Sequence, residues 1–265
     1  MSSTAIAHLN LEVEANIYKT LYEHFLPVYG DRISSYVDSI VAIDHYLGRF
    51  DWLLETLSRN EANIASPILI SGFSAGSEMI AARQSGFQQV YGVEVDPFLV
   101  STTVTRTQYF DDFFPTLYDG QDLPFEDSTF AVVASGHIIE HTNDPFLYLC
   151  ECLRVLKPGG YLALEFPNRF HRTELHTGLP SLEWLPMHIR NSLLKLITCK
   201  FSLLSLNIKN GYRSILGTNL KQISMGKVKS YVKKSGYNYS ILRIDEVAPG
   251  VIRTAIRKNT GTDST

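Results

Sequence analysis

The feature that most constrains the fold is the regular alternation of short apolar runs and helical stretches between residues 67 and 168. Runs such as PILIS (67–71), QVYGVEV (89–95) and FAVVAS (130–135) are separated by segments with helical spacing. Strands that alternate with helices form a parallel sheet whose two faces the helices cover. The clearest part, 133–168, contains a strand, a polar crossing, a helix expected over Pro145–Leu156, and a second strand over Tyr161–Phe166. We expect Gly159 and Gly160 to supply the left-handed stop of that helix.

The flanking segments follow other patterns. Residues 1–64 have apolar positions at helical spacing, which predicts a helical N-terminal cap. Residues 170–220 interrupt the alternation and predict a lid or substrate-binding insertion in a core of 65–258. The strands expected at Tyr239–Ile244 and Val251–Ile256 are joined by a connection too short for a crossover helix, so they must pair antiparallel. Residues 259–265 are expected to form a disordered tail.

Composition narrows the function classes. The chain of 265 residues is 45% hydrophobic, enough for a sizeable core, and has a formal net charge of −3. Because nucleic-acid binders concentrate basic residues on one face, we expect no nucleic-acid partner, and we interpret the lysines of 227–234 as a solvated helix face. The three cysteines favour a reduced, cytoplasmic compartment over a disulfide framework. No apolar run is long enough for a membrane span.

Two motifs follow the first two predicted strands. Gly72 and Gly76 lie in the first strand-to-helix turn, where glycines let the backbone approach a ligand and helix N–H groups favour a carboxylate. Glu94 ends the second strand, 22 residues after Gly72, which matches one strand–helix–strand step. A carboxylate there can accept two hydrogen bonds from a ribose diol. Asp96 is expected to cap the next helix instead.

Two further motifs follow the next strands. Asp119 precedes Gly120 and Gln121 in the string DGQDLPF (119–125). The crossing SGHIIEH (135–141) follows the fourth strand, at the carboxyl edge where ligands bind in open α/β sheets. Its His137, Glu140 and His141 also match the H-x-x-E-H signature of metallopeptidases, but that motif needs a helix, whereas here it follows a buried strand.

Together these motifs resemble those of the class I S-adenosylmethionine (SAM) dependent methyltransferases. Within that family the chain is most similar to the subgroup of ubiquinone-type and other small-molecule methyltransferases. The resemblance implies a Rossmann-like, mostly parallel seven-stranded sheet with an antiparallel C-terminal hairpin. It implies SAM as cofactor and S-adenosylhomocysteine as product, with Asp119 on the adenine amino group. The cofactor-binding residues expected on this basis are Gly72, Ser74, Gly76, Glu94, Asp119, Gly120, Gln121, Ser135 and His137.

Three positions depart from the family pattern. In the string that resembles D-x-G-x-G-x-G, Ile70 replaces the acid and Ser74 the middle glycine, and Ala131 stands where the fourth strand usually has Asp. The first loss removes a common partner of the SAM amino group. Ubiquinone-pathway O-methyltransferases resemble this chain here and place an acid where His137 stands. The change to His weakens the indication of a divalent cation without excluding it, and we assign no metal ligand.

The predicted reaction is methyl transfer, at oxygen, to a small molecule or a glycan. Histidine titrates near neutral pH, so His141 is the first candidate for a general base and His176 the second. His171 or His176 can bond acceptor hydroxyls and Trp184 can stack on a ring, although a packed lid and a braced loop are the structural alternatives. The functional alternatives are a catalytically silent SAM-binding protein and a nicotinamide oxidoreductase, whose G-x-G-x-x-G fingerprint is absent.

Overall fold

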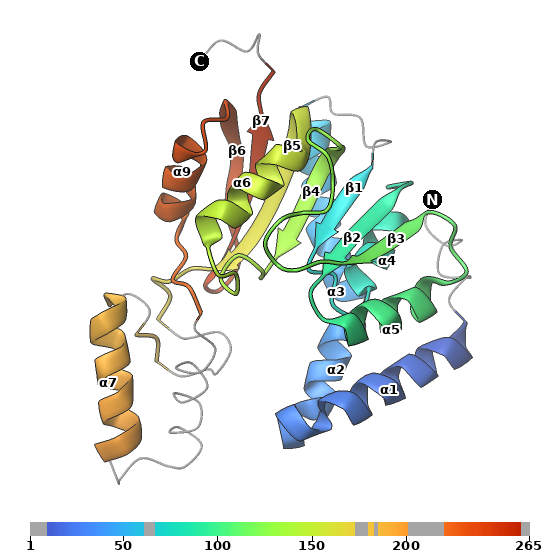
Figure 1. Ribbon diagram of the computed structural model, residues 1–265, viewed down its shortest axis with the longest axis horizontal. Coiled ribbons are helices and arrows are strands. Elements are labelled where there is room, and N and C mark those ends of the chain that lie inside the picture. Colours follow the sequence, from blue (N-terminus) through green and yellow to red (C-terminus); the bar gives the residue numbers. More distant parts are fainter. Residues whose placement is uncertain (1–9, 61–66, 173–179, 183–184, 201–219, 261–265) are drawn as a thin grey trace.

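The computed structural model describes residues 10–60, 67–172, 180–182, 185–200 and 220–260. Its centre is a seven-stranded sheet in the order β3-β2-β1-β4-β5-β7-β6 (Figure 1). The first five strands pair parallel, and β7 is antiparallel to both β5 and β6. The predicted fold class is therefore confirmed. The strands are β1 (Ile68–Ser71), β2 (Val90–Glu94), β3 (Phe113–Leu117), β4 (Phe130–Gly136), β5 (Leu156–Pro167), β6 (Tyr239–Ala248) and β7 (Val251–Lys258).

Helices lie on both faces of the sheet and beyond its carboxyl edge (Figure 1). They are α1 (Leu11–Tyr29), α2 (Ile33–Val41), α3 (Asp44–Ser58), α4 (Ser77–Gln84), α5 (Pro97–Thr107), α6 (Pro145–Val155), α7 (Met187–Lys200) and α9 (Met225–Lys234), with a 3-10 turn at Gly30–Arg32. No helix in these described parts is long and apolar enough to cross a membrane.

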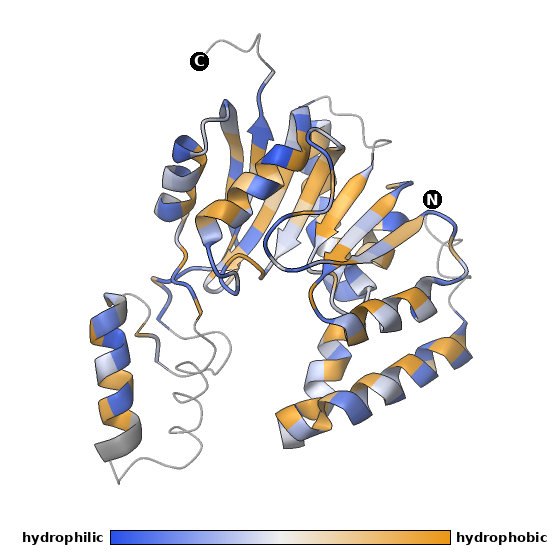
Figure 2. Ribbon diagram, in the orientation of Figure 1, coloured by the Kyte–Doolittle hydropathy of each residue, from blue (hydrophilic) through white to orange (hydrophobic). Residues whose placement is uncertain are grey.

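The two faces have separate cores because side chains alternate along each strand. Ile68 and Ile70 of β1 pack with α3 and α4, whereas Leu69 between them packs with α6 and α9. The central strands β1 and β4 are accordingly almost wholly apolar, as expected for a sheet buried on both faces (Figure 2). A third cluster joins α1 and α2 to α5 and to Ala75, in the turn after β1.

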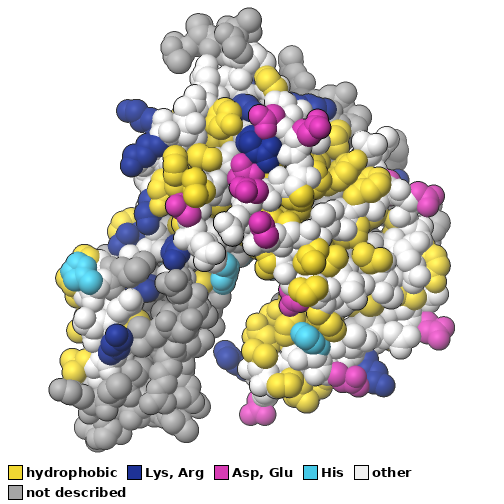
Figure 3. Space-filling view, in the orientation of Figure 1, with side chains coloured by type: hydrophobic (Ala, Val, Ile, Leu, Met, Phe, Trp, Pro, Cys, Tyr) yellow, Lys and Arg dark blue, Asp and Glu magenta, His cyan; other side chains and the backbone are white. Residues whose placement is uncertain are grey.

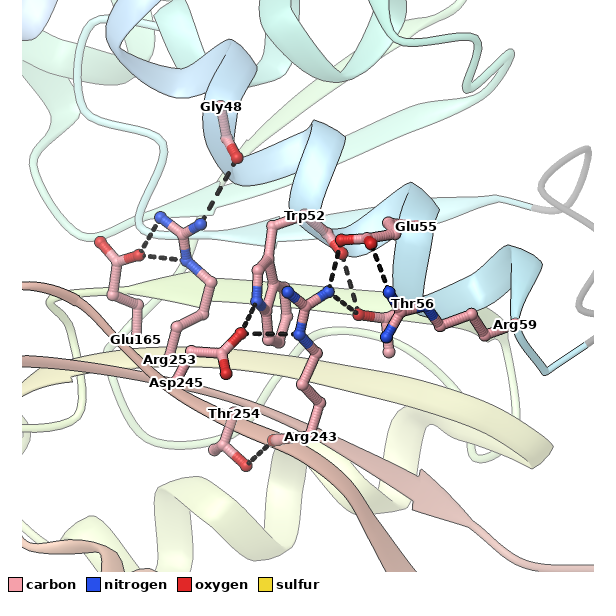
Figure 4. A network of polar contacts seen from close by, with 10 residues as sticks. All are labelled: Gly48, Trp52, Glu55, Thr56, Arg59, Glu165, Arg243, Asp245, Arg253 and Thr254. Carbon is pink, nitrogen blue, oxygen red and sulfur yellow. Dashed lines mark hydrogen bonds and ion pairs between the residues drawn. The ribbon is translucent and has the colours of Figure 1, made fainter.

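Helix α3 is part of this core and not only a covering element. Its Trp52 donates from Nε1 to Asp245 of β6 at 2.6 Å, and Arg243 lies over the Trp52 ring (Figure 4). Arg243 also donates to Glu55 of α3 at 2.7 Å. These contacts attach the N-terminal helical segment to the antiparallel hairpin at the other end of the sequence.

Several local predictions can be checked against the helix ends. Asp144 caps α6, with Pro145 in its first turn, and Ser224 caps α9. The predicted glycine stop of α6 is wrong. The helix ends at Val155, four residues before Gly159, and Gly159 takes its positive φ of 82° where the register of β5 on β4 shifts. The glycine is needed for this irregular strand entry and not for the helix terminus.

Candidate functional site

The candidate site lies at the carboxyl edge of the parallel strands, where the strand order reverses. β1 pairs with β2 on one side and with β4 on the other, so the loops that follow β1 and β4 diverge there. The two loops touch, because a Cβ atom at Gly72 would collide with the side chain of Ile138. Helices α1 and α2 lie beyond this edge (Figure 1), and the space-filling surface is hollowed beneath it (Figure 3).

The turn after β1 keeps a glycine-type backbone although its middle glycine is absent. Gly72, Ser74 and Gly76 all have positive φ angles, of 79°, 50° and 82°. Ser74 pays a conformational cost of about 1–2 kcal/mol for this angle. The surrounding structure holds it there, since Thr103 of α5 donates to the Ser74 carbonyl at 3.2 Å and Ser74 N donates to Glu94. The serine therefore preserves the shape of the turn.

Glu94 at the end of β2 connects two parts of this edge. Its Oε2 accepts from Ser74 N at 3.0 Å and its Oε1 from Val95 N at 2.8 Å. A carboxylate has about four acceptor sites, so the half-buried Glu94 can still accept from a diol. Asp96 caps α5 by accepting from Phe98 N at 2.8 Å, as predicted.

Asp119 follows β3 and is exposed beside the Glu94 loop. Its Oδ1 accepts from Gln121 N at 2.9 Å and from Asp122 N at 3.3 Å, which is a local Asx turn. Gly120 has a φ of 82°, and a Cβ atom there would lie 3.3 Å from Val95. The two acids expected to bind adenine and ribose therefore lie on neighbouring loops.

Ser135 lies differently from the other expected cofactor residues. Its side chain is buried and hydrogen-bonds the Tyr148 hydroxyl at 2.7 Å, and Tyr148 in turn donates to Ser71 at 2.8 Å. This chain of hydroxyls joins β1, β4 and α6 inside the core. It leaves the main chain of Ser135, and not its hydroxyl, to contact a ligand.

His137 stands at the end of β4 with a left-handed φ of 57°. Its Nε2 lies 3.1 Å from Glu165 Oε1 and its Nδ1 lies 3.5 Å from Glu140 Oε1. Burial disfavours the charged imidazole, but the adjacent carboxylates of Glu140 and Glu165 outweigh burial and raise the pKa of His137 to about 9. His137 is therefore a cation at neutral pH.

Glu165 of β5 is the centre of a buried charge network beneath His137. Arg49 of α3 donates to Glu165 at 2.7 Å and to Glu78 of α4 at 2.6 Å, and Arg253 of β7 donates to Glu165 at 2.6 Å. Burial alone would raise the pKa of Glu165, but the His137 hydrogen bond and the two arginines hold it well below its usual range. The Arg49 guanidinium also fills the space that a side chain at Gly136 would need.

Sequence reasoning missed this network, although one signal was present. Glu165 is the single charged residue in the apolar strand YLALEF (161–166), and a charge in a strand buried on both faces requires a partner. The partners Arg49 and Glu78 come from helices whose pattern gives no indication of a buried ion pair.

Glu140 presents a buried carboxylate for which the structure provides no hydrogen bond. Its side chain is 1% exposed, and neither oxygen has a hydrogen-bond partner. The nearest basic groups are His137 and the 46%-exposed His141, whose Nε2 lies 4.0 Å from Oε1. A buried carboxylate in this state is costly, and Glu140 is one of the groups that favour the charged form of His137.

The remaining predicted residues lie further from this cluster or outside the described ranges. His137–His141 form turns and not a helix, so the spacing that a metallopeptidase helix requires is absent. Within the described ranges, no group of three or more His, Cys, Asp or Glu residues is placed to hold a metal ion. The ring of His171 packs against Gly250 in the β6–β7 turn. His176 and Trp184 lie outside the described residues.

The shape of the site fits a nucleoside cofactor that carries an amino acid group. The turn at Gly72–Gly76 has no room for larger side chains at its glycines: a Cβ at Gly76 would lie 2.7 Å from Thr103. Beside it lie the carboxylate of Glu94 and the exposed carboxylate of Asp119. Glycine-type backbone and two carboxylates are thus present on three adjacent loops.

Comparison with known proteins gives one family match. Residues 69–164 match the family model described as a methyltransferase domain. A demethylmenaquinone methyltransferase of Tropheryma whipplei is 26% identical over 159 residues, which are 57% of this chain and 66% of that relative. The chain thus spans slightly less than two thirds of the relative's length.

Solved structures show the same fold at low identity. A SAM-dependent methyltransferase from Aquifex aeolicus has a TM-score of 0.53 at 15% identity, covering 92% of this chain and 98% of its own. One from Mesorhizobium loti has a TM-score of 0.55 at 13% identity, covering 82% of this chain and 100% of its own.

Proposed function

We propose that this chain, whose residues 69–164 match a methyltransferase domain and which shares the fold of SAM-dependent methyltransferases, moves the methyl group of SAM to an oxygen atom of a small-molecule or glycan acceptor. S-adenosylhomocysteine is the second product. The observation that carries the proposal is the meeting of the Gly72–Gly76 turn, Glu94 and Asp119 at the strand-order reversal. In this arrangement the turn receives the methionine carboxylate, Glu94 the ribose diol and Asp119 the adenine amino group. Gly120, Gln121, His137 and the main chain of Ser135 complete the cofactor side.

Bound SAM supplies a methyl group that its positive sulfur has already activated. The protein has two remaining tasks: to hold the acceptor in line with that methyl group and to accept the hydroxyl proton. We assign the second task to His141, which is exposed at the carboxyl edge. Glu140, 4.0 Å away and without a hydrogen bond, stabilises the imidazolium that forms. His137 already carries its proton at neutral pH, so it acts as a donor and not as the base.

The acceptor side of the site belongs to the proposal as well. We assign it to the insertion 170–220, with His176 as the second candidate base. Demethylmenaquinone, which appears in the name of a relative, is one acceptor to test beside phenols and glycans. A cytoplasmic location is also proposed, and the free state of Cys150 and Cys152 supports it.

Calorimetry with SAM, S-adenosylhomocysteine and NAD tests the cofactor. We expect both sulfur compounds to bind with micromolar Kd and NAD to give no heat of binding. Binding of NAD alone would replace this proposal with a nicotinamide oxidoreductase. Transfer of a labelled methyl group is then measured over the acceptor panel. The silent SAM-binding alternative would be favoured if the protein binds SAM but transfers the methyl group to no acceptor, and if the His141→Ala variant binds SAM as tightly as the wild type.

A further inference from the structure

The basic residues of this protein are concentrated in one part of the chain. Between Trp184 and Ile244 there are eleven Lys and Arg residues and no Asp or Glu, whereas the whole chain has 24 basic and 27 acidic residues. The remainder of the chain is therefore strongly acidic. A charge asymmetry of this kind indicates a polyanionic partner for the basic part. The described elements of this part are α7, α9 and the start of β6.

Helix α7 exposes apolar side chains that its own packing does not use. Leu194 is 1% exposed and marks the side that faces the protein. Ile189, Leu193 and Leu196 recur at helical spacing on another side and are 41%, 37% and 40% exposed. His188 and Lys195 are exposed beside them, and no acidic residue occurs in the helix. A basic helix with an outward apolar stripe is typical of helices that lie in a membrane interface.

Helix α9 adds exposed positive charge without apolar side chains. Its Val228 and Val232 are buried in the core, whereas Lys229, Lys233 and Lys234 are exposed. In the space-filling view, Lys and Arg side chains gather over α9, and hydrophobic side chains follow the outer edge of α7 on the same side of the molecule (Figures 1 and 3). Helix α7 lies beyond the carboxyl edge of the sheet, on the side where the strands end (Figure 1).

We propose that Ile189, Leu193, Leu196, Lys229, Lys233 and Lys234 form a membrane-binding surface that attaches the protein peripherally to bilayers containing anionic phospholipids. Charge complementarity identifies the anionic partner, and the aliphatic stripe identifies a lipid. Aliphatic side chains gain free energy when they enter the acyl boundary, whereas a nucleic-acid backbone offers them no apolar contact. None of these six residues is aromatic, so they offer no ring on which a base could stack.

Vesicle co-sedimentation of the full chain tests the proposal. We expect binding to vesicles of phosphatidylcholine mixed with phosphatidylglycerol, and little binding to phosphatidylcholine alone. Raising the salt concentration should weaken binding, because the Debye length falls from about 10 Å at 0.1 M to about 3 Å at 1 M. A Lys229→Ala/Lys233→Ala/Lys234→Ala variant should bind more weakly by about fivefold for each lysine at low salt. Equal binding of the protein to both kinds of vesicle, or to neither, would contradict the proposal.

The apolar stripe separates a lipid from other polyanions. An Ile189→Ser/Leu193→Ser/Leu196→Ser variant should lose at least about tenfold in vesicle affinity. Its matched control is Leu11→Ser/Val28→Ser on α1, whose side chains are also exposed and should be dispensable. Thermal unfolding verifies that each variant is folded. If the α7 variant binds vesicles as tightly as the wild type, or if a short RNA displaces the wild type and binds both proteins equally, the surface recognises a general polyanion and the lipid assignment is wrong.

Discussion

Glu94 and Asp96 are acids two residues apart with different surroundings. Asp96 accepts a hydrogen bond from the first turn of α5. Glu94 accepts one from the turn after β1 and one from its own loop, and so connects the two. Both are common acceptors of backbone N–H groups, but only Glu94 also lies beside Asp119's loop, through Val95 and Gly120. Glu94 is therefore proposed to contact the ligand and Asp96 caps a helix because of their positions at the sheet edge, and not because of their residue types.

Replacing Glu94 by Ala should weaken SAM binding by about 1–3 kcal/mol, because two ribose hydrogen bonds and the support of Ser74 N are lost together. Calorimetry measures the affinity. Asp96→Ala is the matched control: it should cost about 1 kcal/mol of stability through the lost cap and leave SAM affinity unchanged. A folded Glu94→Ala protein with wild-type SAM affinity would disprove the ribose assignment.

The charge on His137 makes stability depend on pH. Its pKa in the folded protein, about 9, lies above the ordinary value of 6.5, so protonation stabilises the fold fully below pH 6.5 and this contribution disappears as pH rises through about 9. Urea unfolding at a series of pH values should therefore show falling stability over that window. His137→Asn, which tolerates the left-handed backbone, should flatten the fall. An unchanged slope in the variant would assign the pH dependence to other groups.

Among the elements, α5 has the largest role in arranging the site. Its fully buried Arg106 donates to the Ala75 carbonyl of the β1 turn at 2.9 Å, to Ser77 at 2.6 Å and to the Val41 carbonyl at the end of α2. The same guanidinium holds Glu14 of α1 through two bonds of 2.8 and 2.7 Å. One side chain thus positions two N-terminal helices against the turn that is proposed to bind the cofactor.

Arg106→Met should lower the free energy of unfolding by about 3–5 kcal/mol, since it leaves carbonyls and a carboxylate without their buried partner. Urea denaturation provides the measurement. Arg83→Met is the control, because Arg83 forms a partly exposed ion pair with Asp112 and should change stability by no more than about 1 kcal/mol. Equal effects of the two substitutions would show that Arg106 does not organise these helices.

On the scale of the whole molecule, the N-terminal segment and the C-terminal hairpin depend on each other. Trp52 and Asp245, which are hydrogen-bonded, lie 193 residues apart in the sequence. Phe50 and Leu53 of α3 are buried in the core under β1 and β4, and Arg49 neutralises Glu78 and Glu165. The helical segment preceding β1 is therefore required by the sheet that follows it.

A fragment beginning at residue 65 should fail to fold, because it loses this core layer and leaves Glu78 and Glu165 without Arg49. A fragment beginning at residue 43 keeps α3 and should retain a cooperative, though less stable, unfolding transition. Circular dichroism with thermal melting compares the two. A cooperative melt of the shorter fragment would show that α3 is an accessory element.

Sequence reasoning succeeded where the signal was local. The order of strands and helices followed from the hydrophobic period, and the N-cap Asp96 followed from residue type at a helix start. It failed at Gly159, where a turn residue near a helix end belonged to an irregular strand entry. It placed Ser135 on the cofactor side although the hydroxyl is used inside the core, because residue type does not reveal which way a side chain at a strand end points.

The sequence by itself determined the alternating sheet, its hairpin and the loops that carry Glu94 and Asp119, because periodicity and turn residues act between near neighbours in the chain. Only the tertiary structure decided the electrostatics of the site. Arg49 reaches Glu78 across 29 residues and Glu165 across 116, and through Glu165 this network determines the charge of His137. The packing of elements that are distant in the sequence decides which buried charges form pairs. Such pairs cannot be predicted from the periodicity of the sequence.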